Sequence, residues 1–261
     1  GGLVRLFFVS GYSALSLLLL VPMAKAGDAD FTVHRKLVLA KKTDGFDGSL
    51  EVWRDKRLTD ADLKIMREHD PDSDPANGPR FKAVPVKPAV IRLKSEDGHL
   101  IQSLILEKPM AEIEAKNIGM KGQRIFLVTQ DFGIGMGSYN GPITRILEVT
   151  PKSAAWAEAL DRRSGKKTRI SLMRSLKSAW SFTPAKTGGV EDILEARSYP
   201  DETSDGFTTS FSRYHRDRRG WTTRVRTEPG LWESEDDDGR VGYSLPAPKV
   251  SFPPGFEETN R

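Results

Sequence analysis

The stretch RIFLVTQDFGIGMGSYNGPITRILEV, residues 124–149, decides the fold. It contains two apolar runs, 125–128 and 143–149, that are rich in β-branched and large aliphatic residues, and such runs are typical of strands buried within a sheet. Four glycines and a proline between the runs allow or impose backbone angles that a regular strand does not use. The stretch therefore predicts two buried strands joined by a loop of defined shape.

The loop carries four side chains that can face a ligand. They are Asp131, Ser138, Tyr139 and Asn140. Binding residues concentrate on loops held by rigid strands, so we predict a contact site at 131–141. The alternative is a hairpin with a glycine bulge, in which the tyrosine packs sideways. A nucleotide-binding fingerprint is excluded, because serine stands at the position of its third glycine and no helix follows.

Alternating or apolar runs on both sides of this stretch predict further strands. They cover residues 31–39, 50–54, 90–93, 100–106, 113–115, 156–160, 193–199, 207–215 and 221–227. Helical spacing predicts two helices, at 59–69, where Thr59 or Asp60 can cap the first turn, and at 171–180. His34 falls on the more polar face of its strand, and we expect it to be solvated. The chain is therefore predicted to be mainly β (α+β), an antiparallel sandwich or curved meander with two short covering helices.

The first 26 residues have the pattern of a secretory signal peptide. Arg5 precedes an apolar stretch at 14–21, and the A-x-A pattern at 24–26 is typical of a cleavage site. The alternative is an uncleaved membrane anchor, since about 20 apolar residues can span a bilayer. We favour cleavage because Pro22 interrupts a helix just before the A-x-A pattern.

Composition shifts divide the remaining chain into four regions. These are an N-terminal hairpin plus helix at 27–69, a proline-rich linker at 70–88, a main β-rich domain at 89–230 and an acidic, proline-rich tail at 231–261.

The absence of cysteine excludes disulfides, thiolate metal sites, cysteine nucleophiles and a lipoprotein lipidated at cysteine. The net charge of +4 falls to +2 when Arg5 and Lys25 are removed with the signal peptide. A nearly neutral chain gives no general argument for nucleic acid, or for a membrane after signal removal, as a partner. We therefore expect an extracytoplasmic protein, periplasmic or secreted, that binds a protein or an envelope glycan.

An arginine-rich hairpin near the end of the chain is a second candidate for ligand binding. Arg213, Arg224, Arg226 and Trp221 belong to a group of six arginines with interleaved aromatics, which can hold phosphate, sulfate or an acidic glycan. The alternative, which we favour, is that the acidic residues from Glu228 onward neutralise this group within the protein.

Three aspartates suggest a metal site after the first helix. Asp70, Asp72 and Asp74 alternate, as oxygen ligands of Ca²⁺ can. The EF-hand pattern fails, because Pro75 and Phe81 stand where it needs glycine and glutamate. We favour a solvated acidic loop, keep Ca²⁺ as the alternative and predict no other cofactor.

Catalytic patterns are weak throughout the chain. The first carboxylates to test for a glycosidase are Asp131 and Glu148, which lie near the ends of predicted strands. Because no complete catalytic set is visible, the leading hypothesis is an exported, non-catalytic binding or interaction domain of the bacterial cell envelope. The alternatives are a secreted hydrolase acting on envelope polysaccharide and a structural envelope protein.

Overall fold

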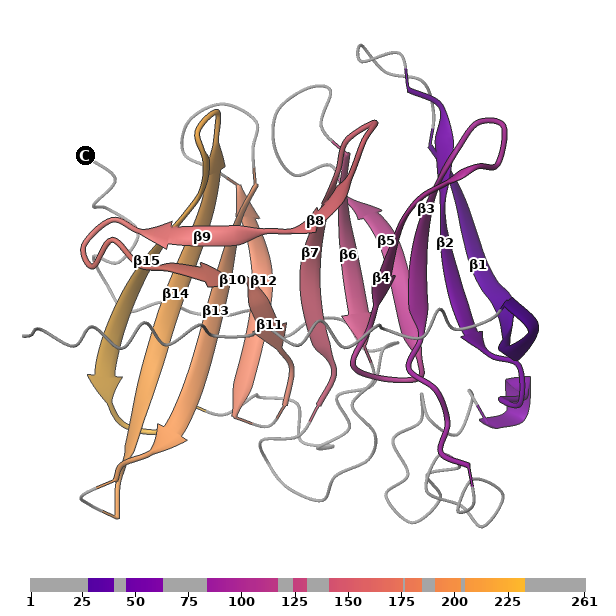
Figure 1. The fold of residues 1–261 in the computed structure, drawn as a ribbon. Coiled ribbons are helices and arrows are strands. Elements are labelled where there is room, and N and C mark those ends of the chain that lie inside the picture. The colour runs from indigo at the N-terminus through magenta and orange to yellow at the C-terminus, as the bar shows by residue number, and fades with distance from the viewer. Residues whose placement is uncertain are drawn as a thin grey trace, which may run out of the picture.

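The computed structural model describes residues 28–39, 46–62, 84–116, 124–130, 141–175, 177–184, 191–202 and 205–232. These residues form fifteen strands in three sheets, preceded by a short 3₁₀ turn at Asp28–Asp30. Figure 1 shows the three sheets side by side, from the indigo N-terminal strands to the yellow C-terminal strands. The expectation of a mainly β, antiparallel chain is confirmed. No helix within the described ranges is long and apolar enough to cross a membrane.

The N-terminal sheet is an antiparallel meander of four strands. In order they are β1 (Phe31–Leu39), β2 (Gly48–Asp55), β3 (Val90–Ser95) and β4 (Leu100–Ile105). A tight turn joins β3 to β4, and in it Gly98 has a φ of 84°, which glycine adopts without strain. Because β2 pairs with β3, strands that precede and follow the proline-rich segment share one sheet.

The central sheet contains the two strands of the stretch 124–149. Its order is β11 (Ser171–Met173), β7 (Ile143–Val149), β6 (Arg124–Gln130) and β5 (Ala111–Lys116), and β8 (Ala154–Trp156) also pairs with β7. The strands predicted in this stretch are therefore confirmed, and they pair antiparallel along their whole length.

The C-terminal sheet has six strands. Its order is β10 (Lys167–Arg169), β9 (Glu158–Asp161), β15 (Gly220–Pro229), β14 (Phe207–Asp217), β13 (Glu191–Pro200) and β12 (Ser178–Pro184). The pair β9 and β15 is parallel, and every other pairing between the described strands is antiparallel.

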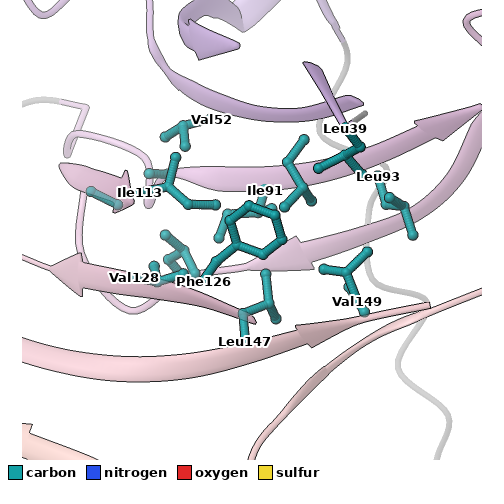
Figure 2. Close-up of a cluster of buried hydrophobic side chains, with 14 residues drawn as sticks. Leu39, Val52, Ile91, Leu93, Ile113, Phe126, Val128, Leu147 and Val149 are labelled. Atoms are coloured by element: carbon teal, nitrogen blue, oxygen red, sulfur yellow. The ribbon is translucent and has the colours of Figure 1, made fainter. Parts of the chain in front are cut away.

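The central sheet lies between the other two and is buried on both faces. Phe126 and Val128 of β6 pack against the N-terminal sheet, and Figure 2 shows the Phe126 ring in the middle of this cluster. Ile125 and Leu127, whose side chains point the other way, pack against the C-terminal sheet. A strand buried on both faces needs a continuous apolar run, and this explains the sequence of β6.

An ion pair between His34 and Glu112 links the N-terminal and central sheets. Nε2 of His34 lies 3.1 Å from Oε1 of Glu112, and the His34 side chain is only 14% exposed. The expectation that His34 is solvated was therefore wrong. The neighbouring sheet, which the sequence of β1 alone does not reveal, supplies its partner.

The helix predicted at 171–180 was also wrong, because β11 and β12 cover most of these residues. Ser175 and Ser178 form an isolated bridge between the two strands, and their hydroxyl groups lie 2.8 Å apart. Trp180 packs towards the central sheet while Ala179 packs on the opposite face, which is strand alternation. Pairing with β7 and β13 outweighs the weak helical spacing.

The first predicted helix is supported at its start. Residues 60–62 are helical, and the Thr59 hydroxyl accepts a hydrogen bond from the Asp62 backbone N–H at 3.2 Å. The Thr59 N–H in turn donates to the Asp62 carboxylate at 2.7 Å, which completes a reciprocal cap. The rest of this helix, the signal peptide and the tail beyond Trp232 lie outside the described residues.

Candidate functional site

Several of the predicted site residues lie outside the part of the chain that the structure describes. They are the loop residues Asp131, Ser138, Tyr139 and Asn140 and the three candidate calcium ligands Asp70, Asp72 and Asp74. Among the described residues, no group of three or more acidic or histidine side chains is placed to hold a metal ion.

Glu148 is held between the central and C-terminal sheets. Its Oε1 accepts hydrogen bonds from Arg216 Nε at 2.9 Å and from Trp221 Nε1 at 3.0 Å. Trp221 is only 4% exposed, so its indole belongs to the interface between the sheets. Both donors to this oxygen are side chains of the C-terminal sheet, and Glu148 therefore links the central sheet to the C-terminal sheet.

Strand alternation divides the arginine-rich hairpin between the two faces of the C-terminal sheet. Arg216 points inward to Glu148, whereas Arg213 lies on the outward face, directly opposite Arg224 in the register of β14 and β15. Arg226, two residues further along β15, shares this outward face. The structure thus brings Arg213, Arg224 and Arg226 together and places Trp221 on the other side.

A buried carboxylate on the neighbouring strand organises the outward arginines. Asp192 on β13 is 1% exposed, and its Oδ2 accepts a hydrogen bond from Arg213 Nε at 2.5 Å. Its Oδ1 lies 2.6 Å from Nδ1 of His215. Sequence analysis missed Asp192, because it precedes these partners by more than 20 residues and only strand register brings them together. Glu228, one of the acids expected to neutralise the hairpin, lies 2.5 Å from Arg226.

The outward face of the N-terminal sheet holds a tryptophan beside two cations of the neighbouring strand β3, and sequence analysis missed this group as well. The Arg92 guanidinium lies 4.1 Å from the Trp53 ring centroid, and Lys94 Nζ lies 5.2 Å from it. Trp53 Nε1 donates to Glu51 at 2.9 Å, and Lys94 Nζ lies 2.8 Å from the same carboxylate. Burial would raise the pKa of Glu51, but the hydrogen bonds from Lys94 and Trp53 outweigh burial and lower it.

Exposed apolar side chains border this tryptophan on the two edge strands. In the register of the sheet, Val33 and Ile105 lie in the row of Trp53, and Val38 and Leu100 lie in the row of Lys94. Their exposed fractions are 43% for Val33, 48% for Ile105, 79% for Val38 and 55% for Leu100. We call these four residues together with Trp53 and Lys94 the Trp53 face.

A further polar group, centred on Glu195, is enclosed between the central and C-terminal sheets. Glu195 is 4% exposed and is contacted by Arg197 at 2.5 Å, by the Tyr214 hydroxyl at 3.3 Å and by the Met173 N–H at 3.3 Å. Burial raises the pKa of Glu195 above its ordinary value, against the opposing effect of Arg197. Burial likewise raises the pKa of Tyr214. The group is surrounded by its own partners and therefore forms part of the interior.

Comparisons with known proteins give no further guide to the site. No family model matches the chain, and neither a curated protein nor a solved structure matches it significantly.

Proposed function

We propose that this chain is an exported, non-catalytic binding or interaction domain of the bacterial cell envelope. The observation that carries the proposal is the Trp53 face, on which four exposed apolar side chains of the edge strands lie in the same rows of the sheet as Trp53 and Lys94. Exposed apolar patches with an aromatic centre are typical of interaction surfaces.

The Trp53 indole is contacted by three side chains of its own sheet. Arg92 and Lys94 hold the ring, and Glu51 fixes its N–H group. A side chain that is immobile in the free protein loses little conformational entropy on binding, and this favours affinity. The exposed apolar side chains on β1 and β4 suit a protein partner. The alternative partner is an envelope glycan, of which a sugar ring would stack on Trp53.

The predicted contact site at 131–141 remains part of this proposal as a second contact. A secreted hydrolase has less support, because Glu148 is bonded to Arg216 and Trp221 and would have to give up both contacts to act as an acid or base. A structural envelope protein without a ligand is the outcome expected if the Trp53 face proves inert.

The test uses the full chain and changes exposed residues only. In the double variant Val38→Glu/Leu100→Glu, two charges are placed on the Trp53 face, and the control Val225→Glu alters a residue of β15 that is 50% exposed. We expect the double variant to bind isolated cell envelopes at least about tenfold more weakly than the unaltered chain, and the control to bind normally.

Envelopes treated with protease or with glycan hydrolases then identify which component is bound. Equal envelope binding by both variants and the unaltered chain would refute a role for the Trp53 face. No binding by the unaltered chain would favour the structural alternative.

A further inference from the structure

Arg174 lies in the link between β11 and β12, at the interface between the central and C-terminal sheets. Its backbone N–H donates to the Pro142 carbonyl at 3.2 Å, and its carbonyl oxygen lies against Gly141. The central carbon of its guanidinium lies 4.3 Å from the ring centroid of Trp180, which is 4% exposed and packs in the core between the two sheets. The protein thus contacts both the backbone and the side chain of Arg174.

The two terminal nitrogens of this guanidinium are open to solvent. Nε of Arg174 is buried and has no hydrogen-bond partner. Nη1 and Nη2 are not buried, and they too find no hydrogen-bond acceptor among the residues that the structure describes. The guanidinium is therefore oriented by Trp180 and Nε, and it presents two unused donors at its tip.

The charge of Arg174 is partly buried without an acid in contact with it. Burial lowers the pKa of Arg174, and Glu114 opposes this effect from a distance, without forming an ion pair with it. By contrast, Arg197 and Arg216, which lie at the same interface, each contact a glutamate. A partly buried charge without a partner costs free energy, and an anion in contact with the guanidinium would offset part of that cost.

We propose that Arg174 binds a carboxylate group, either of a free small acid or of an acidic side chain of a peptide. Nη1 and Nη2 can each donate to one carboxylate oxygen, and the single positive charge of Arg174 balances that of the carboxylate. A phosphate group carries about 1.5–2 negative charges and a third oxygen, which one guanidinium does not satisfy. The inference goes beyond the proposed function, because neither Arg174 nor Trp180 belongs to the Trp53 face.

The experiment is an NMR titration of the full chain, followed through the Arg174 Nε–H and Trp180 Nε1–H signals. The probes are sodium acetate, a capped Gly-Glu-Gly tripeptide, its Gly-Gln-Gly counterpart and sodium phosphate, all at constant ionic strength and pH. The site variants are Arg174→Gln, which removes the charge, and Arg174→Lys, which keeps the charge but removes the fork. The matched control is Arg169→Gln, which removes the same charge from an exposed position of β10.

We expect acetate and the Gly-Glu-Gly tripeptide to shift both signals, with dissociation constants in the millimolar range. Followed through the Trp180 signal, Arg174→Gln should raise the dissociation constant at least about tenfold and Arg174→Lys about threefold. Arg169→Gln should change it less than about twofold. Tighter binding of the tripeptide than of acetate would show that the carboxylate belongs to a peptide, and equal or weaker binding would indicate a free small acid.

Three results would overturn the proposal. They are the absence of a shift with either carboxylate, binding of phosphate or of the Gly-Gln-Gly tripeptide as tight as that of acetate, and an equal loss in Arg174→Gln and Arg169→Gln. The Trp53-face variant Val38→Glu/Leu100→Glu should bind acetate normally. A failure of this proposal is therefore distinguishable from a failure of the proposed function.

Discussion

Asp55 anchors the end of β2 to the segment that enters β3, and replacing it with asparagine should destabilise the fold in a pH-dependent way. Its side chain is 2% exposed and accepts hydrogen bonds from Arg57 Nε at 2.9 Å, Arg57 Nη2 at 2.5 Å and the Lys87 N–H at 2.9 Å. Arg57 in turn donates to the carbonyl groups of Val84 and Pro85. The carboxylate therefore links the end of β2 to Lys87, which lies 32 residues further along the chain.

The magnitude follows from the pKa of Asp55. Burial alone would raise this pKa, but the hydrogen bonds from Arg57 and Lys87 outweigh burial and lower it from 3.8 to about 2. At about 1.4 kcal/mol per pKa unit, the charge contributes at most about 2 kcal/mol to folding. The Arg57 side chain is 32% exposed, so water screens part of this contribution. We expect Asp55→Asn to lower the free energy of unfolding by about 1–2 kcal/mol at pH 7.

The assay is urea unfolding of the unaltered chain and of Asp55→Asn between pH 2 and pH 7. The folded-state pKa is depressed, so the contribution is complete above the unfolded pKa of 3.8 and is lost as the pH falls towards 2. The difference between the two proteins should therefore be constant above about pH 5 and shrink below pH 4. The control is Asp30→Asn, which neutralises an exposed partner of Lys87 and should leave stability nearly unchanged. A difference that is negligible at pH 7, or that does not vary with pH, would refute the reasoning.

Three further predictions concern the packing of the sheets. Phe126→Ala removes the ring at the centre of the core between the N-terminal and central sheets. It should lower the free energy of unfolding, measured with urea, by about 3–5 kcal/mol. A loss below about 1 kcal/mol would contradict the central position of the ring. Gly141→Ala should prevent or severely impair folding, because its new Cβ would lie 1.7 Å from the Arg174 carbonyl oxygen. The measurements are the soluble yield and the circular dichroism spectrum. A native spectrum and an unchanged Tm would show that the backbone around Gly141 can shift to make room. Arg216→Met should lower the free energy of unfolding by about 1–3 kcal/mol, because the Glu148 carboxylate keeps only its hydrogen bond from Trp221. In thermal unfolding, the double variant Glu148→Gln/Arg216→Met should recover part of this loss. If the effects of the two substitutions simply add, the two residues do not interact.

The strands were predictable because most of them carry strong local signals. Strand β6 reads as a continuous apolar run, and Gly98 marks a tight hairpin, so neither needs knowledge of distant residues. The segment 171–180 was wrongly predicted to be a helix, because its apolar residues fit the spacing of a helix as well as that of a strand. Only its pairing with β7 and β13 decides between the two. Short segments of this kind take their structure from their neighbours.

The candidate sites were less predictable, because they depend on which strands become neighbours. Alternation along β14 already implies that Arg213 and Arg216 point to opposite faces, so the division of the arginine hairpin was available from sequence. The role of Asp192 was not, since it needs the register of β13 with β14. Trp53 was overlooked because a tryptophan in a predicted strand is usually core, and only the position of its sheet at the end of the stack leaves this face outward.

The order of the three sheets follows from the apolar side chains on both faces of β6 and from polar contacts that β5 and β7, the neighbours of β6, make with the two outer sheets. Strand β6 of the central sheet packs Phe126 and Val128 against the N-terminal sheet and Ile125 and Leu127 against the C-terminal sheet, so the central sheet is covered on both faces. On one side His34 reaches Glu112 across the N-terminal interface, and on the other side Arg216 reaches Glu148 across the C-terminal interface. Each tie pairs one residue of the central sheet with one residue of a single outer sheet. If the two outer sheets exchanged places, both carboxylates would lose their partners, so the polar ties specify an order that apolar packing alone would leave open.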